Sequence, residues 1–287
     1  MNVKIVLSLL TLSASAWVSG QAAKPPKQLH LTLRRQVLVK GPEGNKTWEV
    51  VNSEVTWNPR ETVLILVDVW NTHWCPTWAR YAARMVPRQN EVLHALRDMG
   101  VQIVHSPTAP AMAPYYNHPG FRWMKTFPYV PMPPATSLKL PPQPLTVSMP
   151  DEGCDAWERY DRFHPGFHPA ENEYSQAPGI DIVFEENGVK DGISEIAQDI
   201  WNMMQAKGIK NVIGMGQAAN MCLLGREPGM YTWLGRGINT VVVGDLTEAA
   251  YTPIDPPYVT HEEATRLMVE YIEKFLCPTV NSEGVLK

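Results

Sequence analysis

This sequence lacks most of the short motifs that assign a chemistry directly. No C-x-x-C pair, G-x-G-x-x-G run or P-loop pattern occurs, so a structural zinc site, a thioredoxin-like motif and the standard nucleotide-binding loops have no support. Only 19% of the 287 residues are charged and the net charge is -4, so we expect no basic face for nucleic acid. After the first 20 residues, no apolar run approaches the length of a membrane span.

Those first 20 residues have the composition of a targeting segment. Lys4 is followed by an apolar run over residues 5–12 and by small residues at positions 14–16, which is the layout of a secretory signal peptide. We therefore expect an exported protein, periplasmic or secreted, in which residues 21–287 form one large domain. A retained N-terminal anchor is the alternative.

The chain has four cysteines, at positions 75, 154, 222 and 277. In an exported protein they can form disulfides, and the sequence does not choose among the three complete pairings. If Cys222 is a nucleophile, at most one bridge can form among the other three.

Apolar patterns predict a hairpin followed by alternating strands and helices. Residues 29–39 and 47–57 are rich in Leu, Val and Thr, and the Gly, Pro and Asn residues between them are typical of a β-hairpin. Continuous apolar runs predict buried strands at residues 63–69, 101–105, 180–184, 211–215 and 238–243. Helical spacing predicts helices at residues 78–99, 194–207, 221–234 and 261–275. The alternation indicates an α/β fold with a mostly parallel sheet covered on both faces.

Residues 107–178 interrupt this alternation. They contain more than half of the 26 prolines and show no sustained period, but aromatic residues throughout the segment argue against disorder. We interpret it as an ordered, proline-rich insertion that packs over an edge of the sheet and helps to wall the active site.

Two residues at predicted strand ends indicate a nucleophilic site. Cys222 follows the strand 211–215, and Asp68 lies at the end of the strand 63–69. Because the carboxyl ends of parallel strands share one rim, the two side chains should lie close together. A helix beginning at Cys222 would lower the pKa of its thiol, and Asp68 could accept the proton. The alternatives are a buried apolar cysteine and an aspartate that only caps the next segment.

Several segments around these residues resemble a known family. They are D-x-W-x-x-H-W-C (residues 68–75), G-x-x-x-N-x-C (216–222), N-M-C-x-L-G-R (220–226) and D-L-T (245–247). Together they are similar to the isochorismatase-like cysteine hydrolases, which include nicotinamidases and related amidases, and especially to exported bacterial members. The resemblance implies a three-layer αβα fold, a Cys–Asp–Lys triad that attacks an amide or related carbonyl carbon, and no organic cofactor.

Residue by residue, Cys222 matches the family's nucleophile and Asp68 its proton acceptor. The backbone amides of Ala218 and Cys222 match the oxyanion donors, and the resemblance implies a non-proline cis peptide at Gln217–Ala218. The family's lysine would fall at Val189, so the neighbouring Lys190 is the candidate cation, with a solvated loop lysine as the alternative. The alanines at positions 218 and 219 replace a larger polar pair, which implies an altered pocket.

Five other charged residues lie in the insertion or near the expected nucleophile in the sequence: these are Arg122, Lys125, Arg226, Glu227 and Arg236. Arg122 and Lys125 could supply the cation from another direction, whereas Arg226, Glu227 and Arg236 are interpreted as surface or interface charges on or near the helix after Cys222.

His73, Trp74 and Asn220 are the candidate substrate-binding residues, and for His73 and Trp74 the alternative is a backbone hydrogen bond or core packing. Four histidines raise the question of a metal site, but they lack the family's tight ligand spacing, so we assign no metal. These are His105, His118, His164 and His168.

The sequence therefore favours an exported cysteine hydrolase that acts on a small-molecule amide or a related C–N bond. The resemblance also implies a homo-oligomer. Two further hypotheses remain open at this point. One is a catalytically impaired binding or scaffold protein that has lost the triad's cation, and the other is a metal-dependent enzyme built on the histidines.

Overall fold

The computed structural model describes residues 27–69, 76–146, 179–186 and 188–286. The predicted signal peptide, the later part of the proline-rich insertion and several single residues lie outside this range. Those residues are His73, Trp74, Cys75, Cys154, His164 and His168.

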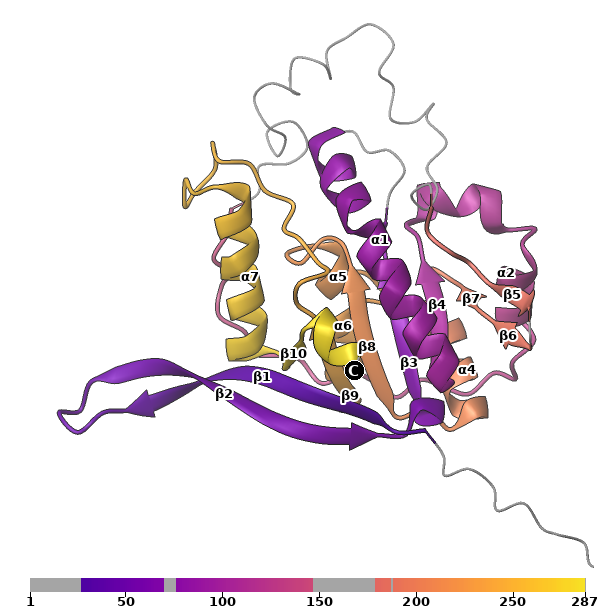
Figure 1. The fold of residues 1–287 in the computed structure, drawn as a ribbon, viewed down its shortest axis with the longest axis horizontal. Coiled ribbons are helices and arrows are strands. Elements are labelled where there is room, and N and C mark those ends of the chain that lie inside the picture. Colours follow the sequence, from indigo (N-terminus) through magenta and orange to yellow (C-terminus); the bar gives the residue numbers. More distant parts are fainter. Residues whose placement is uncertain (1–26, 70–75, 147–178, 187, 287) are drawn as a thin grey trace, which may run out of the picture.

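An eight-stranded sheet in the order β2-β1-β10-β9-β8-β3-β4-β7 forms the centre of the fold (Figure 1). The strands from β10 to β7 run parallel, and the β1–β2 hairpin joins the β10 edge antiparallel, so the predicted α/β fold and N-terminal hairpin are confirmed. The strands are β1 (Leu29–Lys40), β2 (Lys46–Trp57), β3 (Thr62–Val67), β4 (Gln102–Ser106), β7 (Gly192–Ile193), β8 (Asn211–Gly216), β9 (Asn239–Val243) and β10 (Thr279–Val280).

Alternating side chains of the buried strands divide the interior into two cores. Along β3, Leu64 and Leu66 face one core, and the residues between and beside them face the other. The first core is covered by α1 (Pro76–Met99) and α8 (Ser282–Val285). The second is covered by α4 (Ala197–Lys207), α5 (Cys222–Gly225), α6 (Met230–Leu234) and α7 (His261–Phe275). Because both faces of the sheet are covered, the architecture is the three-layer αβα arrangement.

Two predicted elements differ in the structure. The helix predicted over residues 221–234 is broken into α5 and α6, because Pro228 cannot donate a backbone hydrogen bond and Gly229 follows it. The strand predicted at residues 180–184 does not join the central sheet. Instead β5 (Phe184–Glu186) pairs with β6 (Val189–Lys190), and β7 forms the edge beside β4.

The described part of the insertion follows the edge and outer surface of the domain. The 3-10 turn η2 (Ala109–Tyr115) and α2 (Pro119–Met124) come first, and α2 packs against β7. An extended stretch then crosses the outer helices, held at Val130 by the Asn202 side chain, at Thr136 by the Gly235 carbonyl and at Pro141 by the Tyr271 hydroxyl. Among the described residues, no helix has the length and apolarity to cross a membrane.

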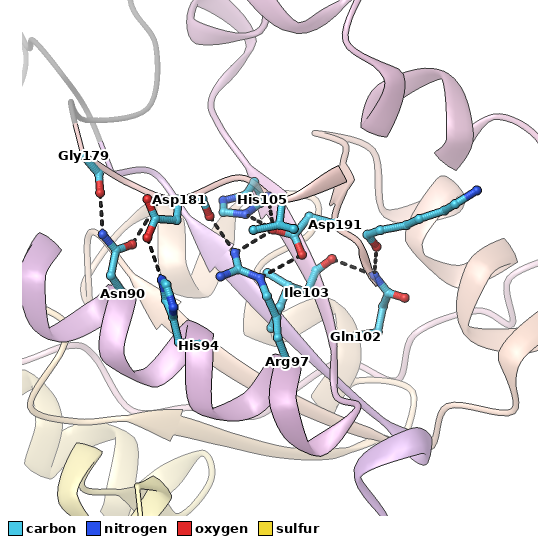
Figure 2. A network of polar contacts seen from close by, with 11 residues as sticks. Asn90, His94, Arg97, Gln102, Ile103, His105, Gly179, Asp181 and Asp191 are labelled. Atoms are coloured by element: carbon cyan, nitrogen blue, oxygen red, sulfur yellow. Dashed lines mark hydrogen bonds and ion pairs between the residues drawn. The ribbon is translucent and has the colours of Figure 1, made fainter. Parts of the chain in front are cut away.

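A polar network joins the segment after the insertion to the body of the domain (Figure 2). Arg97 of α1 donates two hydrogen bonds to the carboxylate of Asp191, at 3.1 and 2.6 Å, and His105 lies 3.1 Å from the same group. Burial opposes the charge of Asp191, but hydrogen bonds with His105 and Arg97 outweigh it and hold the pKa of this carboxyl below its usual value. The ion pair therefore fixes β7 and the segment before it.

Replacing Asp191 by Asn should lower the free energy of unfolding by about 3 kcal/mol at pH 7, because the buried Arg97 loses its counter-ion. Since the pKa of Asp191 is lower in the folded than in the unfolded chain, this stabilisation is present above about pH 4 and is lost as the pH falls further. Urea denaturation across pH 3–7 measures both effects. Asp181→Asn is the matched control, because its pair with His94 is exposed and should contribute less than about 1 kcal/mol.

Candidate active site

Asp68 lies immediately after β3, at the carboxyl end of the sheet. Its backbone N–H donates to the Ser106 carbonyl at the end of β4, and its φ of 43° turns the chain away from the strand direction. The residue is 1% exposed. Burying an ionised carboxylate costs free energy unless the group is paired, so the ionisation of Asp68 depends on its partners.

Cys222 is positioned by a tight turn after the neighbouring strand β8. Gly216 ends this strand at a φ of 110°, and a Cβ atom there would lie 1.9 Å from the Val67 carbonyl oxygen, so only glycine fits. The peptide bond Gln217–Ala218 is cis, as the resemblance implied. The turn brings Cys222 back to the rim as the first residue of α5.

Backbone hydrogen bonds hold this turn against neighbouring segments. The Gln217 N–H donates to the Val67 carbonyl and the Ala219 N–H to the Glu248 carbonyl. The side chain of Asn220 donates to the carbonyl of Ala250 at 2.9 Å and accepts from its N–H at 2.8 Å. Asn220 therefore holds the loop after β9 in place, and its expected role in substrate binding does not fit this geometry.

Arg226 reaches Asp68 from the break between α5 and α6. Its Nη1 lies 2.6 Å from Asp68 Oδ1, and its two terminal nitrogens also donate to Ser106 and to the Pro107 carbonyl. The side chain is only 17% exposed. The expectation that Arg226 is a surface charge is wrong, because the chain turns to extended backbone at this residue and directs the guanidinium to the rim.

The Asp68 carboxylate, the Cys222 thiol and the Arg226 guanidinium form one electrostatic unit. Burial raises the pKa of Asp68, while Arg226, the Cys222 thiol and the Thr108 amide lower it. Burial and the neighbouring Asp68 raise the pKa of Cys222, and Arg226 and the Ala218 N–H oppose this shift. The resting thiol is therefore protonated. The prediction that a helix N-terminus would lower its pKa is wrong, because α5 is a single turn and burial dominates.

Lys190 lies away from this unit. Its Nζ is 3.3 Å from Glu185 Oε1, and its backbone carbonyl accepts from Gln102 at the start of β4, whereas Asp68 lies beside the end of β4. The structure thus separates Lys190 from Cys222. The prediction that Lys190 is the cation of the triad does not fit this position.

Three other charges near the predicted helix and in the insertion also have partners. Lys125 pairs with Asp199 of α4, and Glu227 accepts from the Ala197 N–H at the start of the same helix. Arg236 donates to the Pro133 carbonyl and so holds the insertion. These residues contribute to packing between segments and not to the rim.

The described histidines are engaged in hydrogen bonds. His105 belongs to the Asp191 network, and His118 accepts from the Gly120 N–H at the start of α2. Within the described ranges no group of three His, Cys, Asp or Glu side chains is placed to hold a metal ion. His73 and Trp74, the other substrate-binding candidates, lie outside those ranges.

Sequence reasoning missed Arg226 because it was placed on a continuous helix. Pro228, two residues later, was the available signal, since a proline ends or kinks a helix. That signal indicates a break, but it does not indicate where the arginine then points.

No protein-family model matches the sequence, and no curated protein matches it. Solved structures similar to this chain include a cysteine hydrolase from Pseudomonas syringae pv. phaseolicola, with 14% identity, 80% of this chain and 92% of that chain covered, and a TM-score of 0.48. An isochorismatase family protein from Burkholderia thailandensis has 15% identity, 80% and 95% coverage and a TM-score of 0.42. N-carbamoylsarcosine amidase from Thermoplasma acidophilum has 15% identity, 78% and 97% coverage and a TM-score of 0.37. The chemistry of the site therefore rests on this chain's own residues.

Proposed function

We propose that this protein is a cysteine hydrolase of small amides or related C–N bonds. Cys222 is the nucleophile, Asp68 the proton acceptor, and Arg226 the cation in place of the family's lysine. The observation that carries the proposal is a buried carboxylate that pairs with a guanidinium and raises the pKa of a neighbouring thiol at the carboxyl ends of adjacent parallel strands. The motifs that resemble the isochorismatase-like hydrolases support the same reaction class.

The first half of the reaction forms a thioester and releases the amine. The Sγ–H proton passes to Asp68 as the sulfur attacks the carbonyl carbon, and the oxyanion is held by the N–H groups of Ala218 and Cys222. When the C–N bond breaks, Asp68 returns the proton to the leaving nitrogen. The Ala218 N–H supports this role because it lies near the sulfur and lowers the pKa of Cys222.

The second half consumes water. Asp68 takes a proton from a water molecule, whose oxygen attacks the thioester carbon, and the sulfur leaves and recovers the proton. The carboxylic acid is then released. The proton that leaves with the amine is replaced by the proton taken from water, so the Cys222–Asp68 pair returns to its starting state and no external base is required to balance the cycle.

Arg226 lowers the free-energy cost of this proton transfer in a buried site. The pair carries one negative charge whether the proton lies on sulfur or on oxygen, and the guanidinium faces that charge in both states. The transfer therefore moves a charge beside a fixed cation and does not create a new buried charge. This removes one reason for the scaffold hypothesis, which rested on a missing cation.

The test of the proposed function is ammonia release from a panel of small primary amides, together with intact-mass measurement after exposure to an activated ester. We expect turnover of at least one amide and a single acyl adduct that maps to Cys222. A protein that releases no ammonia from any amide and also forms no adduct at Cys222 would be a scaffold.

Replacing Arg226 by Met should reduce kcat/KM by about 10²-fold, whereas Arg226→Lys should retain much of the activity. Without the guanidinium the pKa of Asp68 rises, so the loss of activity on acidification should begin at a higher pH in Arg226→Met than in the wild type. A pH–rate profile measures this shift. Arg266→Met on the exposed side of α7 is the control, and equal profiles for both variants would contradict the role of Arg226.

A further inference from the structure

The outer half of the β1–β2 hairpin exposes apolar side chains on both of its faces. Val37, Leu38, Trp48, Val50 and Val51 are between 39% and 50% exposed. Leu38 pairs across the strands with Trp48, and Gln36 with Val50, so these side chains share one face, while Val37 and Val51 lie on the other. The hairpin extends well beyond the helices that cover the rest of the sheet (Figure 1).

Helix α7 covers part of one of these faces, as far as Trp48. Gln36 and Arg34 bond to Glu273, and Trp48 packs edge-on against Phe275, which is itself 38% exposed. Beyond these contacts no helix of the described residues lies across the two-stranded ribbon. A two-stranded ribbon of this kind is marginally stable in water, so its apolar surface favours a covering partner.

Strand β2 is also an open edge of the central sheet. Its 12 residues pair with β1 without a break in register, from Leu29↔Trp57 to Lys40↔Lys46, and it contains neither a proline nor a bulge. Within the described residues no strand pairs with its outer side. Edges that stay unpaired are usually protected by charged side chains, a proline, a bulge or a cover, and among the described residues this edge has charges but no proline, bulge or covering strand.

We propose that β2 pairs antiparallel with β2 of a second copy of this chain, about a two-fold axis at Val50. In this register Lys46 lies opposite Glu54 of the partner subunit, and the symmetry repeats the pair. Val50 meets its own copy, and Glu49 lies opposite Val51 of the partner subunit. Lys46 and Glu54 of the two copies are therefore complementary, and the exposed apolar side chains of the two β2 strands lie side by side in one continuous sheet.

Neighbouring registers are less favourable. A two-fold axis at Glu49 would place two glutamates directly opposite each other, and an axis at Val51 would remove both Lys46–Glu54 pairs. The inference depends on the hairpin alone and is independent of the proposed function.

A single cysteine at the axis tests the register. In Val50→Cys the two introduced thiols lie directly opposite each other, so mild oxidation should convert most of the protein into a covalent dimer on a non-reducing gel. Val37→Cys is the matched control, because it is also exposed but lies on β1, one strand further from the axis, where two copies cannot meet. Wild-type protein treated in the same way accounts for the native cysteines.

Charge exchange tests the pairing without new covalent bonds. Lys46→Glu and Glu54→Lys should each weaken the dimer about 10-fold in sedimentation equilibrium, and the double variant should recover the wild-type constant. Circular dichroism checks that the hairpin still folds, since Glu54 also accepts a hydrogen bond from Thr32. A wild-type protein that is monomeric at tens of micromolar, or a Val50→Cys protein that cross-links no more than Val37→Cys, would overturn the proposal.

Discussion

Cys222→Ala should abolish amide hydrolysis, with a loss in kcat of at least about 10³-fold. The reason is that no other described cysteine lies at this rim: Cys277 is 1% exposed and is a fully buried core residue. The fold should survive, because alanine keeps the backbone of the turn and Cys222 is only partly buried. Ammonia release and the unfolding transition of the same preparation measure the two effects.

Cys277→Ala is the matched control for this experiment. Burial raises the pKa of the Cys277 thiol to about 12, so it is an inert thiol in the core and its removal should leave kcat unchanged. If Cys222→Ala and Cys277→Ala retained equal activity, the nucleophilic mechanism would be wrong, and the Cys222 thiol would have a packing role only.

Asp68→Asn should separate the ionisation of the thiol from catalysis. The negative charge of Asp68 raises the pKa of Cys222, and Arg226 lowers it, so removing that charge should make the thiol easier to ionise. We therefore expect faster alkylation of Cys222 by iodoacetamide at pH 7. Hydrolysis should nevertheless fall by about 10²- to 10⁴-fold, because asparagine can neither accept the thiol proton nor return it to the leaving amine.

Opposite changes in these two rates are the signature of a proton acceptor. A purely structural role for Asp68 would lower both rates together, as the rim lost its shape. Asp245→Asn is the matched control, since Asp245 also follows a strand but bonds to Ser282 at the start of α8. It should leave alkylation and hydrolysis at wild-type rates.

The elements with strong local signals could be predicted from the sequence. The hairpin, the strands at the centre of the sheet and the helix at residues 261–275 follow from turn residues and from apolar periodicity, which depend on neighbours along the chain. The edge of the sheet was less predictable. Gly192–Ile193 is too short to give a periodic signal, and the apolar run before it bonds to α1 through Asn90 and Arg97 instead.

The sequence alone determined that Asp68 and Cys222 follow buried strands whose carboxyl ends share one rim, because strand ends are local properties and parallel strands follow a simple topological rule. Tertiary structure alone decided which cation pairs with Asp68. Lys190 stands one position from the family's lysine but lies at the other end of β4, whereas Arg226 turns back to Asp68 at the break before Pro228. The physical reason is that an ion pair depends on distance in space, and a single bend in the chain can change that distance while the residue pattern stays the same.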